Sequence, residues 1–342
     1  MKTRKDGRVV VVTGGTAGIG RATALRFAQE GCDVAVLARG EERLRQTQDE
    51  LAALGVRALA IATDVADADA VERAAAEVEE KLGPIDVWVN NAMTAVFARA
   101  MEITPDEYQR VTAVCYLGYV HGTLAALKRM QSRDRGHLIF VGSAVAYRGI
   151  PLQAAYSSAK HAIQGFFDSL RTELLHEQSG VRVTMVQMPA VNTPQFNWCR
   201  SKLPRKAQPL PPIYQPEVAA DAIYFASTTN RREVWVGAST VKGIIGNRLL
   251  PWYADRYLAR HGVEGQMTNE PKPSTQQDNL YEPAVGNPGA HGDYDARATA
   301  RSPQLWASKH RGTVALTTLA LVSAAAALWC GLTRDALAGQ QS

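Results

Sequence analysis

Short runs of apolar and β-branched residues alternate, over the first 240 residues, with longer segments whose apolar residues recur every three or four positions. The longer segments predict helices at Arg21–Glu30, Asp69–Leu82, Pro105–Met130 and Ala154–His176. The short runs predict strands at Arg8–Thr13, Asp33–Leu37, Ala58–Ala62, Ile85–Val89, His137–Val141, Val181–Val186 and Glu233–Val236. Apolar strands that alternate with helices are typical of a parallel sheet covered on both faces. We therefore expect a doubly wound α/β domain.

The regular pattern fades after Pro251, and residues 262–303 are rich in Pro, Gly, Asn, Gln and Asp. This composition predicts an irregular C-terminal extension, and the pattern leaves open whether the extension packs back on the domain. The Pro-rich segment Thr193–Tyr214 is predicted to be a mobile loop beside the substrate. We expect four parts: a catalytic domain over 1–250, the extension over 251–311, a hydrophobic terminal helix over 312–333 and a short tail over 334–342.

The predicted terminal helix includes Thr313–Thr333, which has no charged residue and is long enough to cross ~30 Å of hydrocarbon. Lys309, His310 and Arg311 precede it, and positive charge favours the cytoplasmic side of a membrane anchor. An amphipathic or protein-packing helix is the alternative, because the segment contains many Ala, Thr and Ser residues. The charged start of the chain leaves no room for a signal peptide. We expect a cytoplasmic catalytic domain that this anchor tethers to a membrane.

The remaining composition narrows the class of partner. The net charge of +5 is small and scattered, and no nucleic-acid motif accompanies it, so we expect no nucleic-acid partner. Four cysteines lie far apart in the chain, at positions 32, 115, 199 and 330. This spacing argues against a disulfide framework and against a metal site. A small-molecule partner is therefore expected.

A glycine-rich turn, Thr13–Gly20 (TGGTAGIG), joins the first predicted strand to the first predicted helix. Backbone N–H groups and the positive helix end at such a turn can hold the pyrophosphate of a dinucleotide. The second strand is followed by Arg39, where NAD-binding folds usually have an acid for the ribose hydroxyls. A guanidinium suits a 2′-phosphate, which predicts NADP, with NAD as the alternative.

Three residues with acid–base chemistry follow in the second half of the domain. Ser143 comes directly after a predicted strand, and Tyr156 and Lys160 are four residues apart on one face of the next predicted helix. A lysine ammonium beside a phenol favours the phenolate and should lower the tyrosine pKa toward neutrality. This set suits carbonyl reduction, in which carbon takes a hydride and an acid protonates the oxygen.

Residues 8–246 resemble the short-chain dehydrogenase/reductase family. The resemblance rests on the glycine-rich turn, on the triplet Asn90-Asn91-Ala92, and on Ser143, which lies thirteen residues before the tyrosine of a Y-x-x-x-K motif. The resemblance implies a single Rossmann domain with about seven parallel strands, and a homo-oligomer. It also implies that Tyr156 is the acid/base, that Lys160 binds the nicotinamide ribose and that Ser143 positions the substrate oxygen. The cofactor contacts implied are Gly14, Thr16, Gly18, Ile19, Gly20, Arg39, Asp64, Val65, Asn90, Tyr156, Lys160 and Thr193.

The chain departs from the family pattern at three places. Met93 follows the triplet where the family has Gly, and Ala190 stands where the family has the Gly of a Pro-Gly pair. Cys115 occupies the position of a fourth catalytic residue, an Asn, and we interpret it as an inert buried thiol. We expect an NADP(H)-dependent oxidoreductase acting on a carbonyl or secondary alcohol, lipid-like if the chain is tethered. The alternative is a dinucleotide-binding scaffold with little turnover.

Overall fold

The computed structural model describes residues 7–318 and 323, and it divides into a compact unit of residues 1–302 and a second unit of residues 303–342. The first unit is built on a parallel sheet of seven strands in the order β12-β7-β6-β4-β1-β2-β3. This confirms the predicted Rossmann-like sheet. Its strands are β1 (Val9–Thr13), β2 (Asp33–Ala38), β3 (Ala58–Ala62), β4 (Ile85–Asn90), β6 (Gly136–Ser143), β7 (Val181–Met188) and β12 (Glu233–Trp235).

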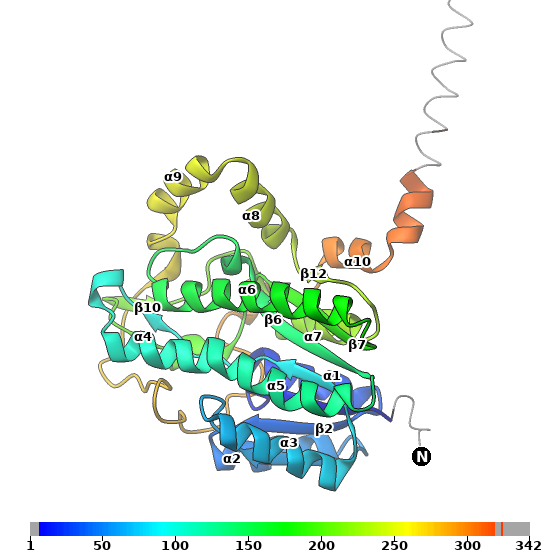
Figure 1. Ribbon diagram of the computed structural model, residues 1–342. Helices are drawn as coiled ribbons and strands as arrows, with labels where there is room; N and C mark the ends of the chain where they lie inside the picture. Colours follow the sequence, from blue (N-terminus) through cyan, green and yellow to red (C-terminus); the bar gives the residue numbers. More distant parts are fainter. Residues whose placement is uncertain (1–6, 319–322, 324–342) are drawn as a thin grey trace, which may run out of the picture. The chain divides into compact units, whose positions relative to one another are not determined.

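Helices cover both faces of the sheet, with α3, α5 and α6 on one face and α1 and α7 packed together on the other (Figure 1). Buried apolar side chains on both faces of the strands explain this arrangement, since each face needs a cover. The predicted helix over 105–130 is two helices joined by a π-helical turn at Ala113–Leu117. The helices are α1 (Gly18–Gln29), α2 (Glu41–Ala52), α3 (Ala68–Leu82), α4 (Pro105–Thr112), α5 (Gly118–Gln131), α6 (Ala154–His176) and α7 (Pro216–Ser227).

The strand order reverses between β1 and β4, which are neighbours in the sheet. The loops after these two strands leave a crevice at such a switch point, and ligands of open α/β sheets bind there. Thr13, at the end of β1, ties the loops together. Its hydroxyl accepts hydrogen bonds from the amides of Asn91 (2.9 Å) and Ala92 (3.1 Å) and donates to the carbonyl of Val89 (3.3 Å).

The segments predicted to be loops are partly regular and pair with one another. Residues 251–261, at the start of the predicted extension, form helix α9 (Pro251–His261), which follows α8 (Ala238–Leu249). Strand β13 (Met267–Pro271) pairs antiparallel with β10 (Arg205–Ala207). Three further pairings are parallel: β11 (Ile213–Tyr214) lies between β8 (Ala190–Val191) and β14 (Ala298–Thr299), and β5 (Val96–Phe97) pairs with β9 (Arg200–Ser201). The extension therefore packs back on the domain as far as residue 302.

The second unit begins with α10 (Pro303–Lys309). Among the described residues, no helix combines the length and the apolar character that a membrane crossing requires. The predicted terminal helix over 312–333 lies mostly outside the described residues, which include only 312–318 and 323 of it.

Candidate active site

A cavity of about 860 Å³ lies over the carboxyl ends of β1, β2, β4, β6 and β7. It collects residues that are far apart in the sequence, because the carboxyl ends of parallel strands share one edge of the sheet. All but one of the predicted site residues line it: Gly14, Thr16, Gly18, Ile19, Gly20, Arg39, Asp64, Val65, Ser143, Tyr156, Lys160 and Thr193.

Gly14 and Gly20 of the glycine-rich turn are packed too tightly to carry a side chain. A Cβ at Gly20 would lie 2.2 Å from the carbonyl oxygen of Gly14 and 2.5 Å from Nδ2 of Asn91. Gly14 has φ +66°, and a Cβ there would lie 2.8 Å from Cα of Ala92. The backbone of the turn therefore borders the cavity directly at the start of α1, where N–H groups and the helix dipole suit a pyrophosphate.

Asn90 is the predicted site residue that the structure does not bring to the cavity. Its buried carboxamide accepts a hydrogen bond from the indole of Trp88 (2.9 Å) and donates to the hydroxyl of Thr123 (3.0 Å), which braces β4 against α5. Its neighbour Asn91 lines the cavity and donates to the carbonyls of Thr13 (2.9 Å) and Gly14 (3.3 Å).

Tyr156, in the first turn of α6, lines the cavity together with Ser143, at the end of β6. Lys160 lies one turn further along α6, and its buried ammonium donates to the carbonyl of Val141 (2.7 Å) and to the hydroxyl of Tyr119 (3.0 Å). The ammonium nitrogen is 5.6 Å from the centre of the Tyr156 ring. The three predicted catalytic residues thus meet at one end of the cavity.

The buried environment shifts the pKa values of Tyr156 and Lys160 away from their ordinary values. Desolvation raises the pKa of Tyr156, and proximity to Cys115 adds to this, while the nearby Ser143 side chain lowers it. Desolvation also lowers the pKa of Lys160 to about 8. The predicted lowering of the tyrosine pKa is therefore not seen in this arrangement, because desolvation outweighs the effects that favour the phenolate. At neutral pH Tyr156 is a phenol that can donate a proton.

Cys115 sits inside the π-helical turn between α4 and α5 and is fully buried. Its thiol donates to the carbonyl of Thr94 (3.1 Å) and accepts from the amide of the same residue (3.3 Å). Burial raises the pKa of the thiol, so it stays neutral. The side chain joins the π-helical turn to the loop after β4 by hydrogen bonds with Thr94. A buried, neutral and hydrogen-bonded thiol agrees with the interpretation of Cys115 as inert.

We expect Cys115→Ala to lower the free energy of unfolding by roughly 1–2 kcal/mol, since the substitution leaves the Thr94 backbone groups unpaired. Turnover should change by less than about threefold, because the thiol transfers no proton. Cys115→Ser retains a donor and an acceptor and is the matched control. Thermal unfolding and turnover measure the two effects. Loss of activity in a Cys115→Ala protein that remains folded would show that the thiol takes part in the chemistry.

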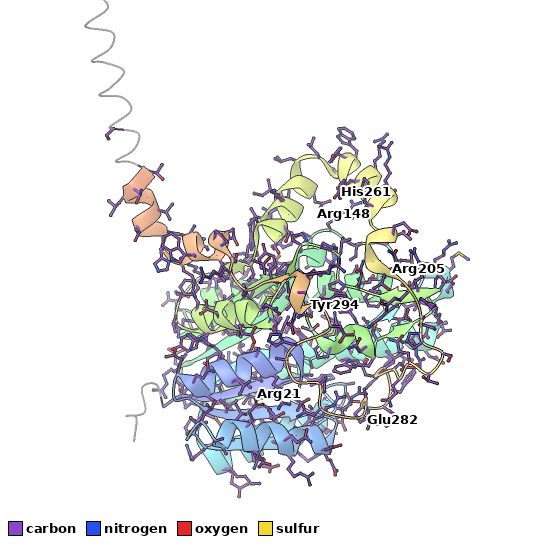
Figure 2. All side chains as sticks on the ribbon, turned by 180° about the vertical axis from the view of Figure 1, so that it is seen from behind. Arg21, Arg148, Arg205, His261, Glu282 and Tyr294 are labelled. Atoms are coloured by element: carbon purple, nitrogen blue, oxygen red, sulfur yellow. The ribbon has the colours of Figure 1, made fainter. Side chains whose placement is uncertain are left out.

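Several residues that border the cavity carried no recognisable sequence signal. One is Arg43, beside the predicted phosphate-reading position. Its guanidinium carbon is 4.6 Å from the centre of the ring of Trp198, which belongs to the Pro-rich segment expected beside the substrate. The extension contributes Asn279, Pro283 and Ala284. Figure 2 shows the extension passing over the domain between the labelled residues Glu282 and Tyr294. The contacts of the extension with Arg39 and Arg43 join positions at least 240 residues apart, so no local pattern marks them.

The sequence profile of short chain dehydrogenases matches residues 8–203. The chain belongs to the short-chain dehydrogenase family. It is similar to the uncharacterized oxidoreductase YxnA of Bacillus subtilis, with 34% identity over 84% of this chain and 81% of that protein. The 3-dehydrosphinganine reductase of Danio rerio is also 34% identical, over 56% of this chain and 58% of its own length. This short-chain dehydrogenase therefore spans less than two thirds of the second relative and most of the first.

Solved structures support the same assignment. An actinorhodin polyketide ketoreductase with NADPH superimposes with a TM-score of 0.61 at 29% identity, covering 68% of this chain and 96% of that one. An alcohol dehydrogenase of Thermococcus sibiricus complexed with 5-hydroxy-NADP gives a TM-score of 0.59 at 27% identity with the same coverage. The short-chain dehydrogenase described here is thus an oxidoreductase built on the fold of enzymes that bind nicotinamide dinucleotides.

Proposed function

We propose that the protein is an NADP(H)-dependent oxidoreductase that moves a hydride between nicotinamide and a carbonyl or secondary alcohol, with Tyr156 as the acid/base. The observation that carries the proposal is that Ser143, Tyr156 and Lys160 line one cavity with the glycine-rich turn. A phosphate-holding turn at one end and a proton donor at the other suit a long dinucleotide lying between them.

The fit of a dinucleotide rests on the turn itself, which lines the cavity at the start of α1 with three glycines, Gly14, Gly18 and Gly20. When bound, the nicotinamide supplies or accepts the hydride. Ser143 orients the substrate oxygen beside the Tyr156 hydroxyl, which donates its proton during reduction and takes it back during oxidation. The ammonium of Lys160, held by Val141 and Tyr119, stabilises the phenolate that remains. With its pKa near 8, the lysine carries this charge at neutral pH.

The preference for NADP rests on Arg39, which lines the cavity directly after β2. We expect Arg39→Ala to weaken NADPH binding roughly 10- to 100-fold more than NADH binding, because charge-assisted hydrogen bonds contribute about 1.5–3 kcal/mol. Fluorescence titration with both nucleotides measures the ratio of the dissociation constants. Arg45→Ala, at an exposed position of α2, is the control and should leave the ratio unchanged. An unchanged ratio in Arg39→Ala would remove the role proposed for this residue.

The substrate end of the cavity supports an apolar, lipid-like small molecule. Beyond Tyr156 the lining is mostly apolar, with Val145, Ile150, Leu210, Leu250, Tyr253 and Leu258. NADPH consumption by the purified protein, over ketones and aldehydes of increasing chain length and with the matching alcohols in reverse, tests the proposed function. Tight NADPH binding without turnover on any substrate would instead favour a dinucleotide-binding scaffold.

We also propose that residues 312–333 anchor the protein to a membrane and that the enzyme assembles as a homo-oligomer. The support for the anchor is an uncharged stretch of sufficient length after Lys309 and Arg311. Full-length protein is expected in the membrane fraction and in detergent extracts, whereas a chain ending at Arg311 should stay in the supernatant. Full-length protein that remains soluble without detergent would rule out the anchor.

A further inference from the structure

Residues 277–289 of the extension, here called the strap, cross the edge of the sheet at which the cavity opens. The strap is fixed at one end by Leu280, whose side chain is fully buried in the main core. Arg110 strengthens this attachment: its Nε donates to the carbonyl of Leu280 (2.8 Å) and its Nη2 binds the carboxylate of Asp64 (2.6 Å). The strap is thereby joined to the loop after β3.

In its middle, the strap holds the two arginines of the β2–α2 region through backbone carbonyls. Arg39 donates to the carbonyls of Asn279 and Tyr281. Arg43 donates to those of Val285 (3.1 Å) and Gly286. A neutral carbonyl orients a guanidinium without cancelling its charge, as a carboxylate would. The strap backbone therefore holds both guanidiniums in place at the cavity with their positive charge.

At its far end the strap reaches the glycine-rich turn. The carbonyl of Gly289 accepts a hydrogen bond from the amide of Gly18 (3.2 Å), and the side-chain oxygen of Asn287 accepts one from Arg21 (2.7 Å). Between the two ends, Asn279, Pro283 and Ala284 line the cavity together with Arg39 and Gly18. The strap therefore forms a wall of the part of the cavity that the proposed function assigns to the adenosine phosphate end of the cofactor.

We propose that the strap retains the bound dinucleotide by closing this end of its site, so that the strap must leave Arg39, Arg43 and Gly18 before the cofactor can dissociate. Leu280 is the positioning residue that keeps the strap closed. The inference rests on the proposed function, since the ligand retained is the NADP(H) of the reaction. The extension would thereby slow the release of the cofactor, a role that neither the glycine-rich turn nor the catalytic residues have.

Two substitutions loosen the strap by different means, and each has a matched control. Gly286→Val acts through the backbone, because Gly286 has φ +84° and a Cβ there would meet nothing within 4 Å. Gly55→Val is its control, at φ +83° in equally open space on the loop between α2 and β3. Leu280→Ala removes the buried attachment of the strap. Its control is Leu174→Ala, which removes the same number of buried side-chain atoms from α6, outside the cavity.

The measurement is the rate constant of NADPH dissociation, followed by stopped-flow fluorescence after mixing with excess NADP. Strain at a positive φ is released when the strap opens, so Gly286→Val should accelerate dissociation about 5- to 30-fold. Leu280→Ala should accelerate it at least as much, and both controls should stay within about twofold of the parent. Hydride transfer in a single turnover of preloaded enzyme should be unchanged in the strap variants, because Val141 and Tyr119, not the strap, hold the ammonium of Lys160 beside Tyr156.

Dissociation from both strap variants at the rate of their controls would overturn the proposal while leaving the proposed function intact. Tighter NADPH binding in the strap variants would also overturn it, because the strap would then exclude the cofactor instead of retaining it. If the parent protein bound neither NADPH nor NADH, the proposed function would fail, and the strap inference with it.

Discussion

Replacing Tyr156 with phenylalanine should lower turnover by about 10³-fold, because proton donation by a positioned side chain contributes 10²- to 10⁴-fold. The NADPH dissociation constant should stay within about twofold, since the variant keeps the aromatic ring that lines the cavity and loses only a hydroxyl. Steady-state turnover and fluorescence titration on the same preparation separate the two quantities. Tyr147→Phe is the control: its hydroxyl binds Glu233 at 2.7 Å, and the residue does not line the cavity.

Combining this substitution with Ser143→Ala tests whether the two residues act as one unit. Because Ser143 positions the oxygen that Tyr156 protonates, the double variant should lose little more activity than Tyr156→Phe alone. Turnover of Tyr156→Phe equal to that of the parent, with Tyr147→Phe also active, would reject the acid/base assignment. Additive losses in the double variant would mean that serine and tyrosine serve separate steps.

The sheet and the ends of the cavity could be predicted because their signals are local. Each strand is a short apolar run, and the residues that follow β1, β2, β3 and β6 necessarily gather at one edge of a parallel sheet. Tyr156 and Lys160 share a helix face through their spacing alone. Helix α6 was predicted with the bounds that the structure gives, Ala154–His176.

Other features depend on tertiary packing and left no local trace. Successive side chains of a strand point to opposite sides, so Asn90 turns into the core and Asn91 toward the cavity. The triplet Asn-Asn-Ala does not by itself reveal which of the two asparagines faces the cavity. Burial, which raises the pKa of Tyr156, is a property of the folded cavity and not of the motif. The strap joins Arg39 to Tyr281 across 242 residues by backbone carbonyls, which every residue possesses.

Gly20→Ala should weaken NADPH binding by at least about 100-fold, the second large effect that the structure predicts. The new Cβ would lie 2.2 Å from the carbonyl oxygen of Gly14 and 2.5 Å from Nδ2 of Asn91. The first of these atoms belongs to the backbone, so relief requires the turn itself to move. Asn91 holds that turn by donating to Thr13 and Gly14, so the displacement disrupts the same network.

Gly165→Ala, in the middle of α6 where a Cβ would meet nothing within 4 Å, is the control for Gly20→Ala. It should leave NADPH binding unchanged and add roughly 0.5–1 kcal/mol of stability, because alanine replaces glycine inside a helix. Gly20→Ala should stay folded but lose about 1–3 kcal/mol through overpacking. Calorimetric titration with NADPH and thermal unfolding measure both. If folded Gly20→Ala protein bound NADPH as tightly as the parent, the pyrophosphate would have to lie elsewhere, because the backbone contact assigned to this turn leaves no room for a methyl group.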